Sequence, residues 1–184
     1  MKLNEAMRTT FAARDYTGEP LPDDVLYHIL DNARFAPSGG NRQGNRVIIV
    51  KNKKTRAALA RLAEPAAKQY LAQVNAGESP WNTVTPSKVT ARQIADTPVP
   101  AMLVEPYIKS AVVLVFVVDL NAVASLDKNL DRIGIISGAS VYPFVWNVLL
   151  GARQAGFGGT ITTLPTAQEP AVQKLLNIPE HYAV

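Results

Sequence analysis

The sequence predicts a single α+β domain, and two observations support this prediction. The chain has 184 residues, of which 47% are hydrophobic and 18% are charged, a composition typical of one globular domain with a substantial core. Segments with helical spacing and segments rich in β-branched residues follow one another without a strict strand–helix–strand repeat. The whole chain, 1–184, is therefore interpreted as one domain that mixes helices and strands.

The first 50 residues predict two helices, a turn and a strand. A first helix is expected over 4–13. A second helix begins at Pro22, has apolar residues at every third or fourth position, and ends before Pro37. The segment 36–41 is rich in Gly, Pro and Ser, which is typical of a turn, and it leads into a β-branched strand over 46–50.

The next part of the chain predicts a helix and then a long loop. Residues 54–76 have helical spacing, with Pro65 as a break or a new start and Gly77 as a stop. Between about 75 and 107, five prolines interrupt any regular pattern, so we expect a variable lid or loop. For Trp81 in this loop, packing onto the body and a substrate-facing lid role are both open.

The last third predicts a central strand, a buried helix and a short strand. Residues 111–118, AVVLVFVV, form a continuous apolar run that favours a strand covered on both faces. Residues 137–154 predict a helix that is apolar nearly all round, which belongs in a core or at a subunit interface. After the glycines that end this helix, 160–163 predicts a further short strand.

Several kinds of chemistry are excluded by residue counts and absent motifs. The chain has no cysteine, so any redox chemistry must come from a bound cofactor. It has no P-loop, GxGxxG, HExxH or GxSxG motif. The two histidines, His28 and His181, lie 153 positions apart, and no metal site is expected. No apolar run is long enough to span a bilayer and no secretory signal is evident, so we expect a cytoplasmic protein without a membrane partner.

The basic residues are unevenly distributed. The segment 42–62 contains seven basic residues and no acidic one. Such a segment suits an anionic ligand such as a nucleotide phosphate or a nucleic acid, but a solvated face has the same pattern. No aromatic residue is interleaved with these bases, so we do not expect a nucleic-acid partner.

Six separated segments point to a family when they are taken together in their order. They are Arg8-Thr9-Thr10, Arg14-Asp15-Tyr16, ARFAPSGGNRQ at 33–43, Gly138-Ala139-Ser140, NVLLGAR at 147–153 and GFGG at 156–159. In this order they closely resemble the FMN-dependent nitroreductase family. The resemblance spans most of 5–181 and is weakest between 75 and 107.

The resemblance implies a fold and an activity. The fold is an α+β sandwich with a mixed central β-sheet flanked by helices, assembled as an intertwined homodimer with FMN at the interface. The activity is that of an FMN-dependent oxidoreductase, which takes hydride from NAD(P)H and reduces a small-molecule acceptor, such as a nitro compound or a quinone, by a ping-pong mechanism. The flavin supplies the chemistry, so no catalytic side chain is implied.

The resemblance also implies which residues bind the cofactor: Arg8, Thr10, Arg14, Pro37, Ser38, Gly39, Asn41, Gly158, Gly159, Thr160 and Thr162. Arg14 matches the cation that stabilises negative charge on the reduced flavin, and Arg8 and Thr10 match positions near the phosphate or ribityl chain. The residues from 37 to 41 match a loop that reaches the flavin from the second subunit, and 158–162 match the segment at the flavin N5 side.

Departures from the family pattern keep an alternative open. Many members have Arg and Ser where this chain has Thr10 and Ala12, and an aromatic residue where it has Asn45. Relatives also continue past the position of Val184 into a last strand, a basic phosphate contact and an arm that wraps the partner. The alternative is a non-catalytic or degenerate flavin-binding protein.

Overall fold

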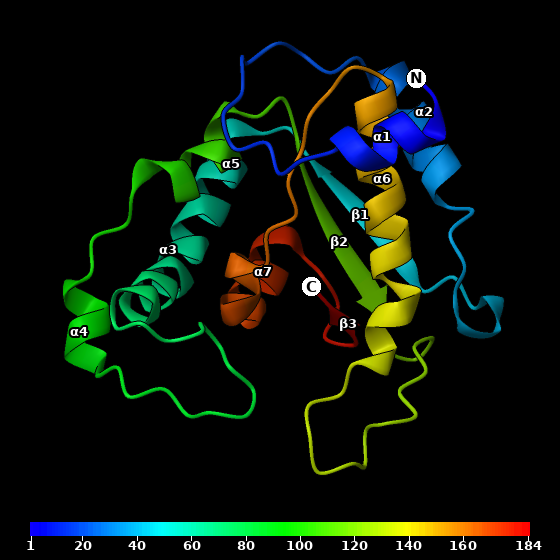
Figure 1. Ribbon diagram of the computed structural model, residues 1–184. Helices are drawn as coiled ribbons and strands as arrows, with labels where there is room; N and C mark the ends of the chain where they lie inside the picture. Colours follow the sequence, from blue (N-terminus) through cyan, green and yellow to red (C-terminus); the bar gives the residue numbers. More distant parts are fainter.

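The centre of the structure, a computed structural model that describes all residues Met1–Val184, is a three-stranded antiparallel sheet. The strands β1 (Asn45–Val50), β2 (Val113–Asp119) and β3 (Tyr182–Ala183) lie in the order β1-β2-β3 (Figure 1). β1 pairs with β2 over its whole length, whereas β3 pairs with β2 only opposite Val118 and Asp119. The prediction of a central apolar strand is confirmed, with bounds shifted by one or two residues.

Helices cover both faces of β2, because its side chains alternate between the faces. Val115 and Val117 are buried on the side of α3 (Lys53–Asn75) and α7 (Glu169–Leu176). Leu114 and Phe116 pack on the other side, against α2 (Asp23–Ala33) and α6 (Tyr142–Gln154). There the rings of Phe116 and Phe144 meet edge to face with centroids 5.6 Å apart. The predicted α+β sandwich is therefore present.

α3 is one continuous helix, so the break predicted at Pro65 is wrong. A proline inside a helix removes one hydrogen bond, but here the flanking residues Ala63, Ala66 and Ala67 are almost fully buried, and this packing holds the helix together. Its first turn is capped by Asn52, whose Oδ1 accepts from the N–H groups of Lys54 and Thr55. Although α3 is long, neither it nor any other helix has the apolar length that crossing a membrane requires.

Two other helix boundaries differ from the prediction. α1 (Leu3–Thr9) ends before Ala13, because the Thr10 side chain donates to Ala6 O and the chain then turns toward a distant segment. α6 begins at Tyr142, after a 3-10 turn over Ile136–Ser140. α2 agrees with the prediction, with Pro22 as its N-cap.

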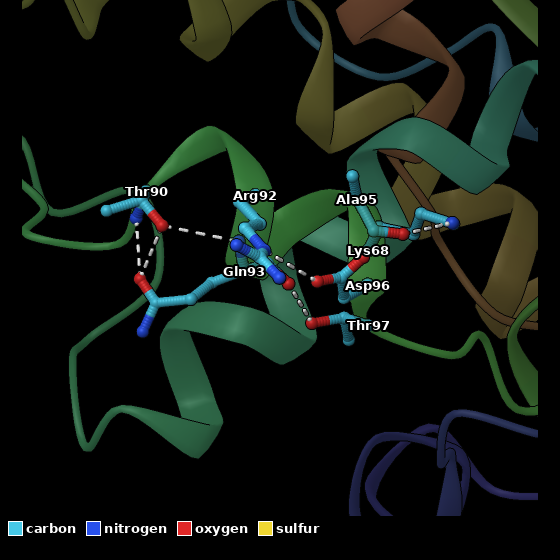
Figure 2. Close-up of polar contacts among 7 residues, drawn as sticks. All are labelled: Lys68, Thr90, Arg92, Gln93, Ala95, Asp96 and Thr97. Carbon is cyan, nitrogen blue, oxygen red and sulfur yellow. Dashed lines mark hydrogen bonds and ion pairs between the residues drawn. The ribbon is translucent and has the colours of Figure 1, made fainter.

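The long segment before β2 contains short helices that sequence patterning did not reveal. They are α4 (Ala91–Asp96), a 3-10 turn over Ala101–Leu103 and α5 (Glu105–Lys109). Figure 2 shows why α4 forms: Thr90 and Gln93 make a reciprocal capping box, and the Thr97 hydroxyl donates to Gln93 O at 2.7 Å. Lys68 of α3 donates to Ala95 O at 2.8 Å and thereby attaches α4 to the body (Figure 2).

Hydrogen bonds also close the loop that contains Trp81. The Glu78 carboxylate accepts from Ser87 Oγ at 2.6 Å and from the Lys88 N–H at 2.7 Å, and these bonds lower the pKa of Glu78. The Trp81 ring is stacked on Tyr70 with centroids 6.0 Å apart. The loop is thus folded onto α3 in this structure.

The strand predicted over 160–163 is absent, and that prediction is wrong. The nearest strand-like contact is an isolated parallel bridge between Ala12 and Gly159. No neighbouring strand pairs with Thr160–Thr163, and the first three of these residues instead line a cavity. Without a partner, β propensity alone does not make a strand.

Candidate functional site

A cavity lies between β2, α6 and two extended segments. Its volume is about 580 Å³, within the usual range for small-molecule pockets. It is lined by residues of the segments 11–21, 106–116 and 145–162. Its lining is mainly apolar.

A smaller hollow of about 210 Å³ lies beside it and is lined by three of the polar residues that the sequence singled out. Thr10, Arg14 and Thr160 line it, together with the aromatic rings of Phe11 and Trp146. The structure therefore brings together predicted residues from the N-terminal segment and from the glycine-rich segment after α6.

Arg14 is exposed, and its guanidinium makes few contacts within the protein. It takes part in no ion pair, and its only hydrogen bond is a long one, 3.4 Å, to Ala12 O. Next to it, burial raises the pKa of Tyr16, and the Arg14 charge partly opposes this shift. A free guanidinium at a hollow is available to an anionic or electron-rich ligand.

The two glycines at 158 and 159 allow the segment after α6 to approach its neighbours closely. A Cβ at Gly158 would lie 3.0 Å from the Ala13 Cβ, and a Cβ at Gly159 would lie 2.9 Å from Leu149 Cδ2. The close approach permits the bond from Ala13 N–H to Gly159 O at 3.0 Å. Gly158, Gly159, Thr160 and Thr162 all line the larger cavity, and Thr160 lines both.

The Pro37–Asn41 loop lies elsewhere. It precedes β1, away from the segment that follows α1 (Figure 1), and lines neither cavity. The Gly39 N–H donates to Ser140 Oγ at 3.0 Å, and Gly40 and Asn41 have φ angles of 60° and 52°. The predicted Gly-Gly turn is present, but within one chain the structure does not bring Pro37, Ser38, Gly39 or Asn41 to Arg14.

Two further predicted residues also lie outside both cavities. Arg8 is exposed in the last turn of α1, and Trp81 packs on Tyr70.

Tyr107 is a cavity residue that the sequence did not single out. It is 5% exposed and lies on α5, and its hydroxyl is hydrogen-bonded to Thr162 Oγ1 at 3.3 Å; both residues line the larger cavity. Burial raises the pKa of Tyr107. Its only sequence signal is one aromatic residue in a short, proline-started helix.

The basic run 42–62 does not form one charged face. Arg56 is buried and donates to Ser110 O, whereas Lys51 pairs with Asp23 of α2. No group of three or more His, Asp or Glu side chains is placed to hold a metal ion.

Comparisons with known proteins identify the family of this chain. The model of the nitroreductase family matches residues 7–184, and the chain belongs to this family. No curated protein sequence matches the chain.

Solved structures share the fold at low sequence identity. A structure of oxidized iodotyrosine deiodinase bound to FMN and 3-iodo-L-tyrosine is 19% identical, with a TM-score of 0.68, covering 98% of this chain and 84% of that one. Nitroreductase A from Vibrio parahaemolyticus is 18% identical, with a TM-score of 0.67 and coverage of 100% and 64%. The NADPH:FMN oxidoreductase from Vibrio harveyi, complexed with NAD+, is 19% identical, with a TM-score of 0.67 and coverage of 99% and 64%. The chain thus spans somewhat less than two thirds of the two Vibrio proteins.

Proposed function

We propose that this chain is an FMN-dependent oxidoreductase that takes hydride from NAD(P)H and reduces a small acceptor, such as a nitro compound or a quinone, by a ping-pong mechanism. The observation that carries the proposal is the unpaired Arg14 guanidinium beside Thr10 and Thr160 in a hollow flanked by aromatic rings. Membership of the nitroreductase family, and FMN in the names of two of the similar structures, support the same cofactor.

The residues at this hollow fit FMN in their chemistry. FMN, when bound, supplies the acceptor and donor of electrons. Arg14 would hold positive charge where the flavin ring gains negative charge, which favours reduction. The Thr160 hydroxyl makes only a 3.4 Å bond to Ile161 O, so it can bond a polar edge of the cofactor. Phe11 and Trp146 offer apolar surface to a planar ring.

We further propose that the complete site needs two copies of the chain. A hollow of about 210 Å³ is smaller than typical cofactor pockets, which begin near 300 Å³, so other surfaces must enclose FMN. The Pro37–Asn41 loop, which does not reach Arg14 within one chain, is then contributed by the partner subunit. Exposed Phe11, Tyr142 and Trp146, at 64%, 57% and 41%, would be covered in such a homodimer.

The segment from about 75 to 107 is proposed as the lid that selects the acceptor. Trp81 is the residue in this segment proposed to face the acceptor, since an aromatic ring stacked on α3 can present one face to a planar molecule.

One observation favours the second candidate, a flavin-binding protein without turnover. The Thr10 hydroxyl donates its hydrogen to Ala6 O at 2.6 Å, and Arg8 lies outside both cavities, so Arg14 is the one cation that lines the hollow. Weak phosphate binding or slow reduction would follow from this arrangement.

An absorbance spectrum tests both candidates. We would record 300–550 nm for the purified protein, then add FMN, and then add NADPH without oxygen. A flavin spectrum that bleaches with NADPH and returns with a nitroaromatic supports the oxidoreductase. Bound FMN that NADPH does not bleach supports the second candidate, and the absence of FMN binding contradicts both.

A further inference from the structure

The Pro37–Asn41 loop and the two residues after it have a backbone shape that their sequence alone does not favour. Gly40, Asn41 and Gln43 have φ angles of 60°, 52° and 50°, in the left-handed region. Glycine adopts this region freely and asparagine tolerates it, whereas for glutamine it is uncommon. Such a conformation persists where surrounding contacts hold it. The contacts of this loop therefore decide its shape.

Hydrogen bonds inside the loop fix the shape of its tip. Ser38 Oγ accepts from the Gln43 N–H at 3.0 Å, and the Asn41 N–H donates to Ser38 O at 2.9 Å. The Gln43 Nε2 group donates to Asn41 Oδ1 at 3.1 Å. Asn41 Nδ2 has no partner in the chain and is free to donate to a ligand. These local bonds do not attach the tip to the rest of the molecule.

Ser140, which lies 101 positions after Gly39, makes this attachment. Its Oγ accepts from the Gly39 N–H at 3.0 Å, and its carbonyl accepts from Asn45 Nδ2 at 2.8 Å. No other hydrogen bond joins residues 37–43 to a distant part of the chain. Asn45 stands where many family members have an aromatic residue, and here its amide takes part in holding the loop. Ser140 therefore holds the chain on both sides of the loop tip.

The position of Ser140 is itself fixed by the buried Asp127 carboxylate. Ser140 is the last residue of the 3-10 turn Ile136–Ser140. At the start of this turn, Asp127 Oδ2 accepts from the Ile135 N–H at 2.8 Å and from the Ile136 N–H at 3.4 Å. A hydrogen bond from a backbone N–H to a carboxylate is stronger than a neutral one. A continuous set of contacts thus runs from Asp127 through Ser140 to the loop.

We propose that Ser140 is a positioning residue for FMN, because it holds the Pro37–Asn41 loop in the shape in which the loop contacts the cofactor of the partner subunit. The inference rests on the proposed function, which assigns this loop to the partner's site. Ser140 lines neither cavity, so it acts through the loop. Without its hydroxyl, Asn41 and Gln43 are free to leave the left-handed region, and FMN binding then has to order the loop again.

Amide exchange in the FMN-free protein tests the first step of this proposal. Ser140→Ala removes the acceptor of the Gly39 N–H, whereas Ser140→Thr keeps a hydroxyl. By NMR, the Gly39 amide of Ser140→Ala should exchange severalfold faster than that of the wild type, and Ser140→Thr should restore slow exchange. The amide of Leu59, a buried residue of α3, should be unchanged in all three proteins. Equal Gly39 exchange in the wild type and in Ser140→Ala would overturn the proposal.

FMN affinity tests the second step. The Kd of Ser140→Ala for FMN, from flavin fluorescence titration, should be about tenfold higher than that of the wild type, because binding has to order the loop. Ser140→Thr should recover most of the affinity. Ser137→Ala is the matched control, since Ser137 lies in the same 3-10 turn and its hydroxyl makes no hydrogen bond, and its Kd should equal that of the wild type.

A double-mutant cycle separates positioning of the loop from a general loss of structure. Asn41→Gly removes the side chain and suits the left-handed region. In a chain that already carries Asn41→Gly, Ser140→Ala should raise the Kd much less, because the contact that it positions is gone. Additive effects of the two changes would contradict a role through the loop.

The affinities also distinguish failure of this inference from failure of the proposed function. A wild type that binds FMN, together with an unchanged Kd in Ser140→Ala, would refute the role of Ser140 and leave the proposed function intact. A wild type that binds no FMN would refute the proposed function and, with it, the role of Ser140.

Discussion

Asp127 organises the loop between β2 and α6 through a single buried carboxylate. Its side chain is 4% exposed, and it accepts from the Ile135 N–H at 2.8 Å and from Arg132 Nη1 at 2.7 Å. These hydrogen bonds lower the pKa of Asp127 from 3.8 to about 2, and the bond from Ile135 has a larger effect than the bond from Arg132. Nothing in the local sequence distinguishes this Asp from Asp131, because its partners are set by how the loop folds.

The lowered pKa predicts a pH-dependent contribution to stability. The unfolded chain takes up this proton near pH 4 and the folded chain only near pH 2, so the contribution is complete at neutral pH and is lost as the pH falls through that interval. Asp127→Asn should therefore be less stable than the wild type at pH 7, with the difference shrinking toward pH 2. Urea unfolding at pH 7, 4 and 2.5 measures this. Exposed Asp131→Asn is the control, and a constant difference at all pH values would refute the linkage.

A second prediction at the residue scale concerns Arg14. If its guanidinium bonds FMN, Arg14→Ala removes a charged hydrogen bond worth roughly 1.5–3 kcal/mol, so the Kd for FMN should rise about ten- to hundredfold. Arg14→Lys keeps the charge and should recover part of the affinity. Flavin fluorescence titration measures each Kd.

The matched control for Arg14 is Arg34→Ala. Arg34 is exposed near the end of α2, pairs with Asp31 at 2.7 Å, and lines neither cavity. An Arg14→Ala variant that binds FMN as tightly as Arg34→Ala would remove Arg14 from the site.

Among the elements, those with one dominant local signal were predictable from the sequence. α2 has an apolar stripe with a proline at its start, and β2 is a nearly continuous apolar run, so both were predicted within a few residues. Pro65 was misleading because burial of the neighbouring alanines outweighs the local penalty. The strand predicted at 160–163 is absent because a strand needs a paired neighbour, and the pattern of these four residues does not show whether one is present.

In the candidate site, too, only the residues with a short local sequence signal were predictable. The motif around Arg14 and the glycines at 158 and 159 are short sequence signals, and the structure places both beside α6. Tyr107 was not predicted, because its contact with Thr162 joins positions 55 residues apart. Such a contact depends on the packing of α5, which no local pattern specifies.

Gly44, the residue before β1, gives a prediction about the packing where β1 and β2 pair. A Cβ at Gly44 would lie 2.8 Å from the Ala122 Cβ and 3.4 Å from Asp119 O, and neither atom is the free end of a side chain. Gly44→Ala should therefore destabilise the fold by about 1–3 kcal/mol through overpacking. Thermal unfolding measures it, with Gly134→Ala as the control, since a Cβ at Gly134 would approach nothing closer than 3.6 Å. Equal effects of the two changes would argue against a tight β1–β2 junction.

At the scale of the whole molecule, the proposed homodimer would account for both the exposed aromatic residues and the small size of the hollow. Phe11 and Trp146 line the hollow and Tyr142 lies one turn before Trp146 on α6, so the three form one apolar patch at the mouth of the proposed flavin site. Covering this patch with a second copy would bury it and would also bring in the partner's Pro37–Asn41 loop. Association and cofactor binding are then a single linked equilibrium.

This linkage predicts that one surface substitution prevents dimer formation and also weakens FMN binding. Trp146→Glu places a charge in the patch while 41% of the side chain is exposed in the single chain, so the subunit should fold normally. We expect it to sediment as a monomer and to bind FMN at least tenfold more weakly than the wild type, whose affinity should rise with protein concentration.

Val84→Glu, at a loop position that is 88% exposed, adds the same charge and should change neither property. Circular dichroism checks the fold, and sedimentation velocity with and without FMN measures the association. A monomeric Trp146→Glu variant that binds FMN with wild-type affinity would show that the hollow of one chain suffices and that the partner's loop is not part of the site.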